Sequence, residues 1–417
     1  MIVRMILRLA LCGCLFACGL GISRGEDWPM WRGARGDGTS LERNVPTEWS
    51  ATNNIVWKTP IPGEGHSSPI VWGDRLFLST ALKETEERCL LSLNRKTGEV
   101  LWQQTVLRSP LEAKNSENSY ASSTPATDGR NIFVTFLDGQ DVVAAACDFA
   151  GRRTWLSRPG QFYSQHGFSH TPVLYKDKVI LVCYSKGENF IAALSRRDGH
   201  TLWKVEGTNA TQSYSPPLLR KMARRMQMIV PGNQAVTSVD PVNGHTLWVL
   251  EGPSEDCVIT PVYNERADLV LSCSSWPKRV LQAIKPDGEG NVTQTKIAWS
   301  STEGAPYVPS PISVGDWFFT CGFEKKDVYC FEAASGKILW HEKMGSHHAS
   351  PVSANGLVYF LNDDGVTHVI KAGPTFQLIA SNDLGERTFA SPAISRGQIF
   401  LRGSKNLYCI GQDSKRL

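Results

Sequence analysis

The sequence lacks the short motifs that mark most catalytic sites. It contains no GxSxG elbow, no HExxH pair, no P-loop and no GxGxxG before a helix. A triad assembled only in space stays open, because Ser and His are plentiful. The sequence also lacks a large excess of charge of one sign. Its 44 basic and 40 acidic residues leave a net charge of only +4, and the basic residues are scattered in short pairs. We therefore expect no nucleic-acid partner.

Metal-ligand spacing is absent among the cysteines. The chain has 11 of them, but Cys12, Cys14 and Cys18 fall in the N-terminal apolar run, and the others form no CxxC or His-rich cluster. A zinc site is not expected. Cys321 and Cys330 could lie across one hairpin, although buried free thiols explain the set equally well.

The only long apolar run lies at the N-terminus. Arg4 and Arg8 precede apolar residues 9–20, and small residues follow, which is typical of a signal peptide over residues 1–25. The run is short for a membrane span. Cleavage near Gly25 and lipoprotein processing at Cys18 are both open, although Phe16 disfavours the second. We expect an exported, periplasmic or envelope-associated protein, with a possible lipid anchor at Cys18.

A Ser/Thr-Pro-x-apolar element recurs along the chain. Successive copies are 40 to 56 residues apart, which suits four short strands with their turns, the period of a propeller blade. A Gly or Asn-Gly turn and a second apolar strand follow each copy. The eight prolines are Pro69, Pro125, Pro172, Pro216, Pro261, Pro311, Pro351 and Pro392.

Most units end on a tryptophan four residues after a glycine. Glycine supplies the positive φ of a hairpin turn, and the indole can cover the neighbouring blade. We interpret these residues as structural docking groups: Trp57, Trp102, Trp155, Trp203, Trp248, Trp299 and Trp340. The seventh unit has Gln377 four residues after Gly373, so looser packing is expected there.

The last unit ends after residues 407–410 without a fourth strand, while residues 55–58 form an unassigned strand before the first Ser-Pro. The N-terminal strand should therefore close the ring and hide both edges. The predicted fold is all-β: an eight-bladed β-propeller of four-stranded antiparallel blades over residues 51–411. An N-terminal extension (26–50) precedes it, and a tail (412–417) follows.

The repeated segment LNRKTGEVLW at residues 93–102, with its copies at 239–248 and 331–340, resembles the PQQ-like (pyrrolo-quinoline quinone repeat) β-propeller family. The resemblance covers residues 51 to 411. It implies the fold but no single function, because the family holds both quinoprotein dehydrogenases and non-catalytic propellers similar to the outer-membrane assembly lipoprotein BamB. The segment DWPMWRG at 27–33 is similar to the extension of exported members, and we expect Trp28 and Trp31 to pack on the outside.

The resemblance leaves two functions open. A quinoprotein needs a clamp for an anionic quinone, a calcium cage and a carboxylate base. This chain is compact, lacks the adjacent cysteine pair that the family's alcohol dehydrogenases use, and has no Asp or Glu directly before a Ser/Thr-Pro. We therefore expect a BamB-like, non-catalytic interaction scaffold without a cofactor or metal. The alternative is a dehydrogenase that uses PQQ with calcium.

Residues just before each Ser/Thr-Pro should ring the mouth of the central channel. They are polar and aromatic, which indicates a funnel for a small polar or anionic ligand; a hydrated pore would also explain them. The long connections 108–120 and 157–170 lie on the same face and could instead hold an envelope protein or peptide. The candidate binding residues are His66, Tyr120, Ser122, His166, Ser169, His170, Gln212, Tyr214, Tyr307, His347, His348 and Arg387.

Overall fold

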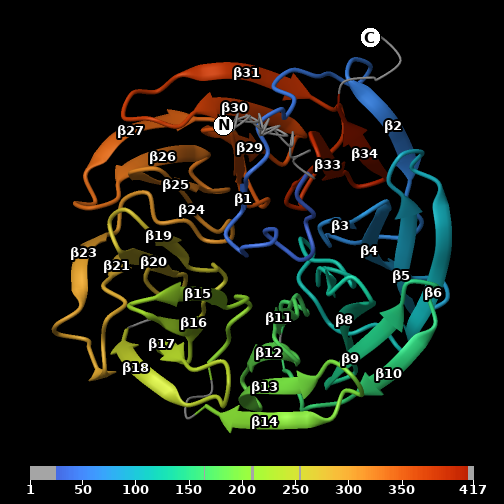
Figure 1. Ribbon diagram of the computed structural model, residues 1–417, viewed down its shortest axis with the longest axis horizontal. Helices are drawn as coiled ribbons and strands as arrows, with labels where there is room; N and C mark the ends of the chain where they lie inside the picture. Colours follow the sequence, from blue (N-terminus) through green and yellow to red (C-terminus); the bar gives the residue numbers. More distant parts are fainter. Residues whose placement is uncertain (1–24, 164, 208–210, 253–254, 412–417) are drawn as a thin grey trace, which may run out of the picture.

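Eight small antiparallel sheets stand around a central axis, as predicted (Figure 1). The structure is a computed structural model that describes residues 25–163, 165–207, 211–252 and 255–411. Within these ranges the secondary structure is strands, bridges and turns without a helix, so no helix there could cross a membrane. The expected signal peptide, its Cys18 and the tail 412–417 lie outside the described residues, with Gly25 as the first described position.

The first four blades follow one another in sequence, each built from the axis outward. Blade one holds β3 (Ile70–Trp72), β4 (Arg75–Leu82), β5 (Glu87–Asn94) and β6 (Val100–Arg108). Blade two holds β7 (Ala126–Thr127), β8 (Asn131–Asp138), β9 (Asp141–Asp148) and β10 (Arg153–Ser157). Blade three holds β11 (Val173–Tyr175), β12 (Lys178–Tyr184), β13 (Asn189–Ser195) and β14 (Thr201–Glu206). Blade four holds β15 (Leu218–Met222), β16 (Arg225–Gly232), β17 (Ala235–Val239) and β18 (Thr246–Glu251), with β22 (Gly290–Asn291) added from blade five.

The other four blades complete the circle. Blade five holds β19 (Val262–Asn264), β20 (Leu269–Ser274), β21 (Val280–Ile284) and β23 (Ile297–Ser301). Blade six holds β24 (Ile312–Val314), β25 (Trp317–Cys321), β26 (Asp327–Glu332) and β27 (Ile338–Lys343). Blade seven holds β28 (Val352–Ala354), β29 (Leu357–Leu361), β30 (Val366–Lys371) and β31 (Leu378–Asp383), and β1 (Thr39–Ser40) pairs with its inner strand. Blade eight holds β32 (Ala393–Ser395), β33 (Gln398–Arg402), β34 (Asn406–Ile410) and β2 (Ile55–Pro60).

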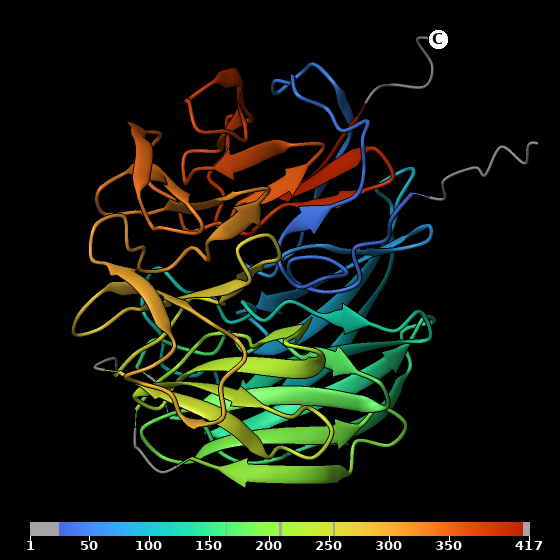
Figure 2. The same ribbon diagram turned by 60° about the vertical axis from the view of Figure 1, so that its left-hand side comes forward.

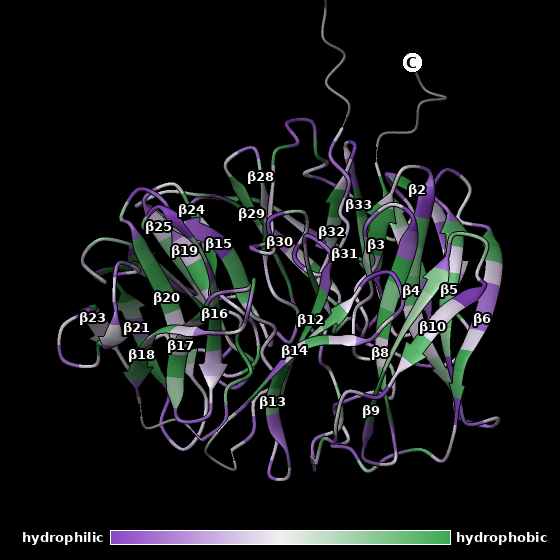
Figure 3. Cartoon of the chain, turned by 60° about the horizontal axis from the view of Figure 1, so that its bottom comes forward, coloured by the Kyte–Doolittle hydropathy of each residue, from purple (hydrophilic) through white to green (hydrophobic). Residues whose placement is uncertain are grey.

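Ring closure occurs where the sequence predicted it. Strand β2 pairs antiparallel with β34, so the N-terminal strand is the fourth strand of blade eight. Middle strands such as β8 and β9 are buried on both faces, because each blade is packed between two others. Outer strands such as β14 are exposed along much of their length. This contrast between buried middle strands and solvated outer strands is visible in the hydropathy colouring of Figure 3, and Figure 2 shows the blades from the side.

The Ser/Thr of the repeat ties neighbouring blades together close to the axis. Its hydroxyl accepts the backbone N–H of the equivalent residue in the preceding blade, at 2.9 to 3.2 Å. This buried contact explains why the motif requires a hydroxyl, since an unpaired amide there would be costly. The five links join Ser68 to Thr124, Thr124 to Thr171, Thr260 to Ser310, Ser310 to Ser350, and Ser350 to Ser391.

Six of the seven predicted tryptophans contact a turn of the following blade. A Cβ on Gly98 would lie 2.6 Å from the Trp57 ring, so only glycine allows this contact. The indole N–H of five of them donates to a turn carbonyl of the next blade: Trp57 to Arg95, Trp102 to Phe149, Trp155 to Arg196, Trp299 to Ala333 and Trp340 to Gly373. Trp203 packs on Gly244, whereas Trp248 donates to Gln227 of its own blade.

The seventh blade is not loosely packed, contrary to expectation. Ala380 occupies its docking position, pairing with Val369 as Trp340 pairs with Cys330. Trp49 of the N-terminal extension fills the space instead. Its ring lies parallel to that of Tyr359 at a centroid distance of 6.5 Å, and it is 5% exposed. Tyr359 has the same register as Phe319 and Phe400, which pack against the docking tryptophans of their own blades.

The extension runs beneath the ring and does not pack on its outside, which corrects the expectation for Trp28 and Trp31. Trp28 is fully buried and forms a bridge with Val71, the middle residue of β3. The chain then crosses the axis toward blade seven, as the blue segment in Figure 1 shows. The extension therefore closes one end of the channel. Cys321 and Cys330 are buried free thiols, so no disulfide joins them across their hairpin.

Candidate functional site

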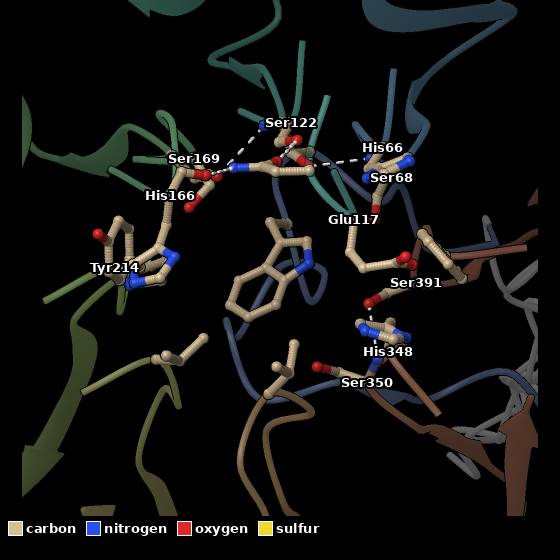
Figure 4. A pocket seen from close by; sticks show the side chains of 18 of the residues that line it. His66, Ser68, Glu117, Ser122, His166, Ser169, Tyr214, His348, Ser350 and Ser391 are labelled. Atoms are coloured by element: carbon tan, nitrogen blue, oxygen red, sulfur yellow. Dashed lines mark hydrogen bonds between the residues drawn. The ribbon is translucent and has the colours of Figure 1, made fainter. Parts of the chain in front are cut away.

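A cavity of about 450 Å³ lies on the propeller axis. Its walls come from the segments that precede the inner strands, and Trp31 of the extension also lines it. We call the open side, where the long connections lie, the mouth face. Figure 4 shows His166 and Tyr214 on one side of the cavity, opposite His66 and Glu117. The lining is Trp31, His66, Ser68, Asn115, Glu117, Asn118, Ser122, Thr124, His166, Ser169, Thr171, Tyr214, Pro216, Asp256, Val258, Tyr307, Val308, Phe323, His348, Ser350, Phe389 and Ser391.

The floor of the cavity is held by contacts on opposite sides of the ring. The carbonyl of Pro29 accepts the N–H of Thr127 in blade two at 2.8 Å. The buried guanidinium of Arg32 donates to the carbonyls of Asp37 and Pro311 at 2.7 and 2.6 Å. Burial lowers the Arg32 pKa to about 10, which leaves the group charged at neutral pH. Trp31 is thus fixed between two anchored neighbours.

His348 is oriented by a carboxylate. Its Nδ1 lies 2.8 Å from Asp363 Oδ2, and its backbone N–H donates to Asp363 Oδ1 at 2.8 Å. The ring also lies against Phe323 and Phe389, with centroid distances of 5.0 and 4.5 Å. A carboxylate at Nδ1 selects the tautomer with the proton there, so Nε2 is an acceptor. His348 can therefore accept a proton or a hydrogen bond from a molecule in the cavity.

The remaining polar lining is mostly neutral. Burial, together with the nearby cation Arg402, lowers the His66 pKa to about 3. Its ring centroid lies 5.0 Å from that of Phe389, with the two rings edge to face. Four Ser and Thr hydroxyls of the lining each accept an inter-blade N–H, which leaves their own hydrogens free to donate. Burial raises the Asp256 pKa. The cavity thus offers hydroxyls and imidazoles between aromatic rings.

Seven of the twelve candidate residues meet in this cavity: His66, Ser122, His166, Ser169, Tyr214, Tyr307 and His348. The other five do not line it. His170, Gln212 and His347 are buried behind the wall, where His170 Nε2 contacts the Ser213 carbonyl at 2.8 Å and Gln212 accepts the Tyr214 hydroxyl. Tyr120 packs against Lys83 and Lys114, and Arg387 is largely exposed.

Several lining residues were not predicted from the sequence. Trp31 was missed because nothing in the sequence indicates that the extension crosses the axis. Glu117 and Asn118 belong to the long connection before Pro125, and Asn118 Nδ2 donates to the His166 carbonyl at 2.7 Å. That bond joins the two long connections. Asp363 follows β29, far from any Ser/Thr-Pro, and only the hairpin fold brings it to His348.

The lining fits a quinone and calcium poorly. An anionic quinone calls for cationic partners, and calcium calls for several converging oxygen ligands. Among the described lining residues there is no Lys or Arg, and Glu117 and Asp256 are the only carboxylates. The described part of the chain contains no cluster of three or more metal-ligating side chains. No catalytic step through such a cofactor follows from this geometry.

Comparison with known proteins places the chain among PQQ-like propellers. BamB from Moraxella catarrhalis is 14% identical, with 85% of this chain and 99% of that chain covered and a TM-score of 0.58. The quinohemoprotein alcohol dehydrogenase of Comamonas testosteroni is 11% identical, with 93% and 81% covered and a TM-score of 0.68. At such identities the likeness concerns the fold alone. A europium-containing methanol dehydrogenase gives 11% identity, 91% and 90% coverage and a TM-score of 0.56.

A search of curated proteins finds no match. The family model described as "Outer membrane protein assembly factor BamB" matches residues 42–122, 90–256, 277–373 and 324–416, which is most of the chain. The chain therefore belongs to this PQQ-like propeller family.

Proposed function

We propose that this chain is an exported, non-catalytic binding propeller of the cell envelope, whose mouth face holds a protein or peptide partner. The observation that carries the proposal is the one-ended channel. Trp31 and the anchored extension close the far end, and the two long connections, joined through Asn118 and His166, border the open end. A rigid ring with a walled recess on one face suits recognition.

The envelope location has two supports. The matching family model is described as an outer membrane protein assembly factor, and a solved relative is BamB. Residues 1–25 have the composition of a signal peptide, with Cys18 as the alternative lipid-anchor site. A protein partner at the envelope is the function consistent with both supports.

Two features of the cavity lining support a non-catalytic role: its hydroxyls form hydrogen bonds between blades, and it lacks cationic side chains. Four Ser and Thr hydroxyls of the cavity, those of Thr124, Thr171, Ser350 and Ser391, accept inter-blade hydrogen bonds, so they serve the fold. The lining contains no described Lys or Arg, which leaves no cationic clamp for an anionic quinone. Binding therefore accounts for the site with fewer assumptions than oxidation does.

The proposal is tested by photo-crosslinking from opposite faces of the ring. A photoreactive residue replaces Tyr163 or Ser116 on the mouth face, or the matched exposed positions Lys96 and Arg130 in turns of the far face. We expect a discrete adduct in envelope fractions from the mouth-face positions, competed by unlabelled protein. Equal yields from both faces would contradict the proposal, because recognition would then not be specific to the mouth.

One observation favours a second candidate, a small-molecule site in the cavity. His348 is held by Asp363 with Nε2 as an acceptor, which is the arrangement of a general base. A dehydrogenase that uses PQQ with calcium is the catalytic form of this candidate. Ligand binding without turnover is the simpler form, since the lining donates hydroxyl hydrogens around aromatic walls. The two forms differ in whether the quinone stabilises the native state.

A further inference from the structure

A second hollow, of about 280 Å³, lies beside the axial cavity at the seam between blades eight and one. It shares His66, Glu117, Asn118 and Phe389 with that cavity, but its charge is different. Four cationic side chains line it, against two carboxylates, which leaves a net charge of 4 − 2 = +2 with His66 neutral. The cations are Lys83, Lys114, Arg387 and Arg402, and the carboxylates are Glu64 and Glu117.

Arg402 is the most unusual of these cations. It ends β33, is 3% exposed, and its Nη1 donates to the carbonyls of Ser67 and Ser79 at 3.1 and 2.7 Å. It forms no ion pair with a carboxylate of the described residues. A buried charge that is compensated only by carbonyls is expensive. Burial lowers its pKa to about 9, so the group is still protonated at neutral pH.

The position of the guanidinium depends on Gly65. A Cβ on Gly65 would lie 2.6 Å from Nη2 of Arg402, so a side chain there would displace the group. The guanidinium therefore forms part of the wall of the hollow. A bound anion would supply the counter-charge that Arg402 lacks.

The other cations are unevenly compensated. Lys83 is paired with Glu64 at 2.5 Å, whereas Arg387 lies 4.0 Å from Glu117, the limit of an ion pair. Lys114 contacts a carbonyl at 3.3 Å and stands 4.9 Å from the centroid of Tyr120. Lys114 and Arg402 are thus the two cations of the hollow without a described carboxylate partner.

We propose that this hollow binds an oxyanion, a carboxylate or phosphate group, between Arg402 on the inside and Lys114 and Arg387 at the entrance. Charge-assisted hydrogen bonds from a planar guanidinium and a mobile ammonium suit either group. The oxyanion belongs to a small solute or to the end of a peptide. The proposal does not depend on the function proposed for the mouth face, because it concerns the binding of a simple ion by the charged side chains of this adjoining hollow.

The test is a titration of the purified chain with sodium phosphate and with succinate at constant ionic strength, followed by calorimetry and by melting temperature. Lys114→Ala/Arg387→Ala is compared with wild type, because both side chains are at the entrance and neither carries the fold. Arg152→Ala/Arg197→Ala is the matched control, since both arginines are largely exposed in far-face turns. This pair of variants avoids the buried Arg402, whose replacement could unfold the chain.

We expect saturable binding to wild type and to the control, and an affinity at least about tenfold lower for the entrance variant, since each lost charged hydrogen bond is worth that much. No saturable binding to wild type, or equal loss in both double variants, would overturn the proposal. A peptide with a free C-terminal carboxylate is compared with its amide. Binding of the free acid more tightly than succinate identifies a peptide source, and equal binding identifies a small solute.

Discussion

Trp49 is predicted to stabilise the seam between blades seven and eight as strongly as a docking tryptophan of the repeat. It is 5% exposed and stacks on Tyr359, and Ala380 packs against the buried cluster that contains both rings. Replacing a buried tryptophan by alanine costs about 3–5 kcal/mol, because transfer and cavity terms add. Removing about 200 Å² of buried ring at ~25 cal/mol per Å² gives a similar ~5 kcal/mol. Trp49→Ala should therefore lower the free energy of unfolding by about 4 kcal/mol.

The assay is urea unfolding followed by circular dichroism. Leu41→Ala is the matched control, because Leu41 belongs to the same extension but is 75% exposed, and it should change stability by less than about 0.5 kcal/mol. Ala380 offers a rescue. Ala380→Trp restores the docking position of the repeat, so it should destabilise wild type by overpacking and stabilise the Trp49→Ala chain.

The opposite effects of Ala380→Trp in the two backgrounds test the prediction most stringently. A stability loss below about 1 kcal/mol for Trp49→Ala would show that the ring only covers the surface. A destabilising effect of Ala380→Trp in both backgrounds would show that Trp49 does not stand in the space of the missing tryptophan. Either result would refute the reasoning.

Two further predictions concern the ring and its buried histidines. Ser310→Ala leaves the buried N–H of Thr260 unpaired and should lower the free energy of unfolding in urea by about 1–3 kcal/mol. The exposed Ser335→Ala is the control and should change it little. Equal effects of the two substitutions would contradict the inter-blade role of Ser310. Burial lowers the His170 pKa from 6.5 to about 4, so the unfolded chain takes up this proton first. The contribution of neutral His170 to the free energy of unfolding is therefore fully present above pH 6.5. It is lost as the pH falls toward 4, by about 3 kcal/mol. His170→Asn should flatten that fall and the exposed His200→Asn should not; an unchanged profile for His170→Asn would argue against the assignment.

The repeat was predictable because several local signals agree. Each Ser/Thr-Pro, its turn and its Gly-x-x-x-Trp occur at a nearly constant period, and only a propeller uses all of them at once. The closing strand followed from the same logic, since the unpaired residues at 55–58 match the missing strand of the last unit. The inter-blade hydroxyl bonds of Ser310 and Ser350 give the physical reason for the motif.

The extension was not predictable in the same way. It occurs once, so no periodicity indicates its path, and its position depends on single contacts such as Arg32 to the Pro311 carbonyl. The roles of Trp31 and Trp49 follow from that path. Trp49 also shows why a missing repeat residue does not imply a gap, because a distant segment can supply the side chain.

The sequence indicated which segments surround the candidate site, but not which of their side chains line the cavity. The segments just before the Ser/Thr-Pro elements form the cavity wall, yet one-residue steps decide whether a side chain lines the cavity or is buried behind it. His348 lines the cavity, whereas its neighbour His347 is fully buried. The same alternation separates Ser169 from His170. Side chains alternate between the two faces of a sheet only within a strand. These residues precede the inner strands, so the sequence alone does not tell which side chains face the cavity.

The claim that the mouth face binds a partner without a quinone cofactor is tested most directly by thermal unfolding of the mature chain titrated with PQQ and calcium. Only a compound that binds the native state raises the melting temperature saturably. The account predicts no saturable rise with PQQ and calcium together, beyond that with calcium alone. A saturable rise, abolished by replacing the cavity residue His348 with alanine, would contradict the scaffold function and identify a quinoprotein.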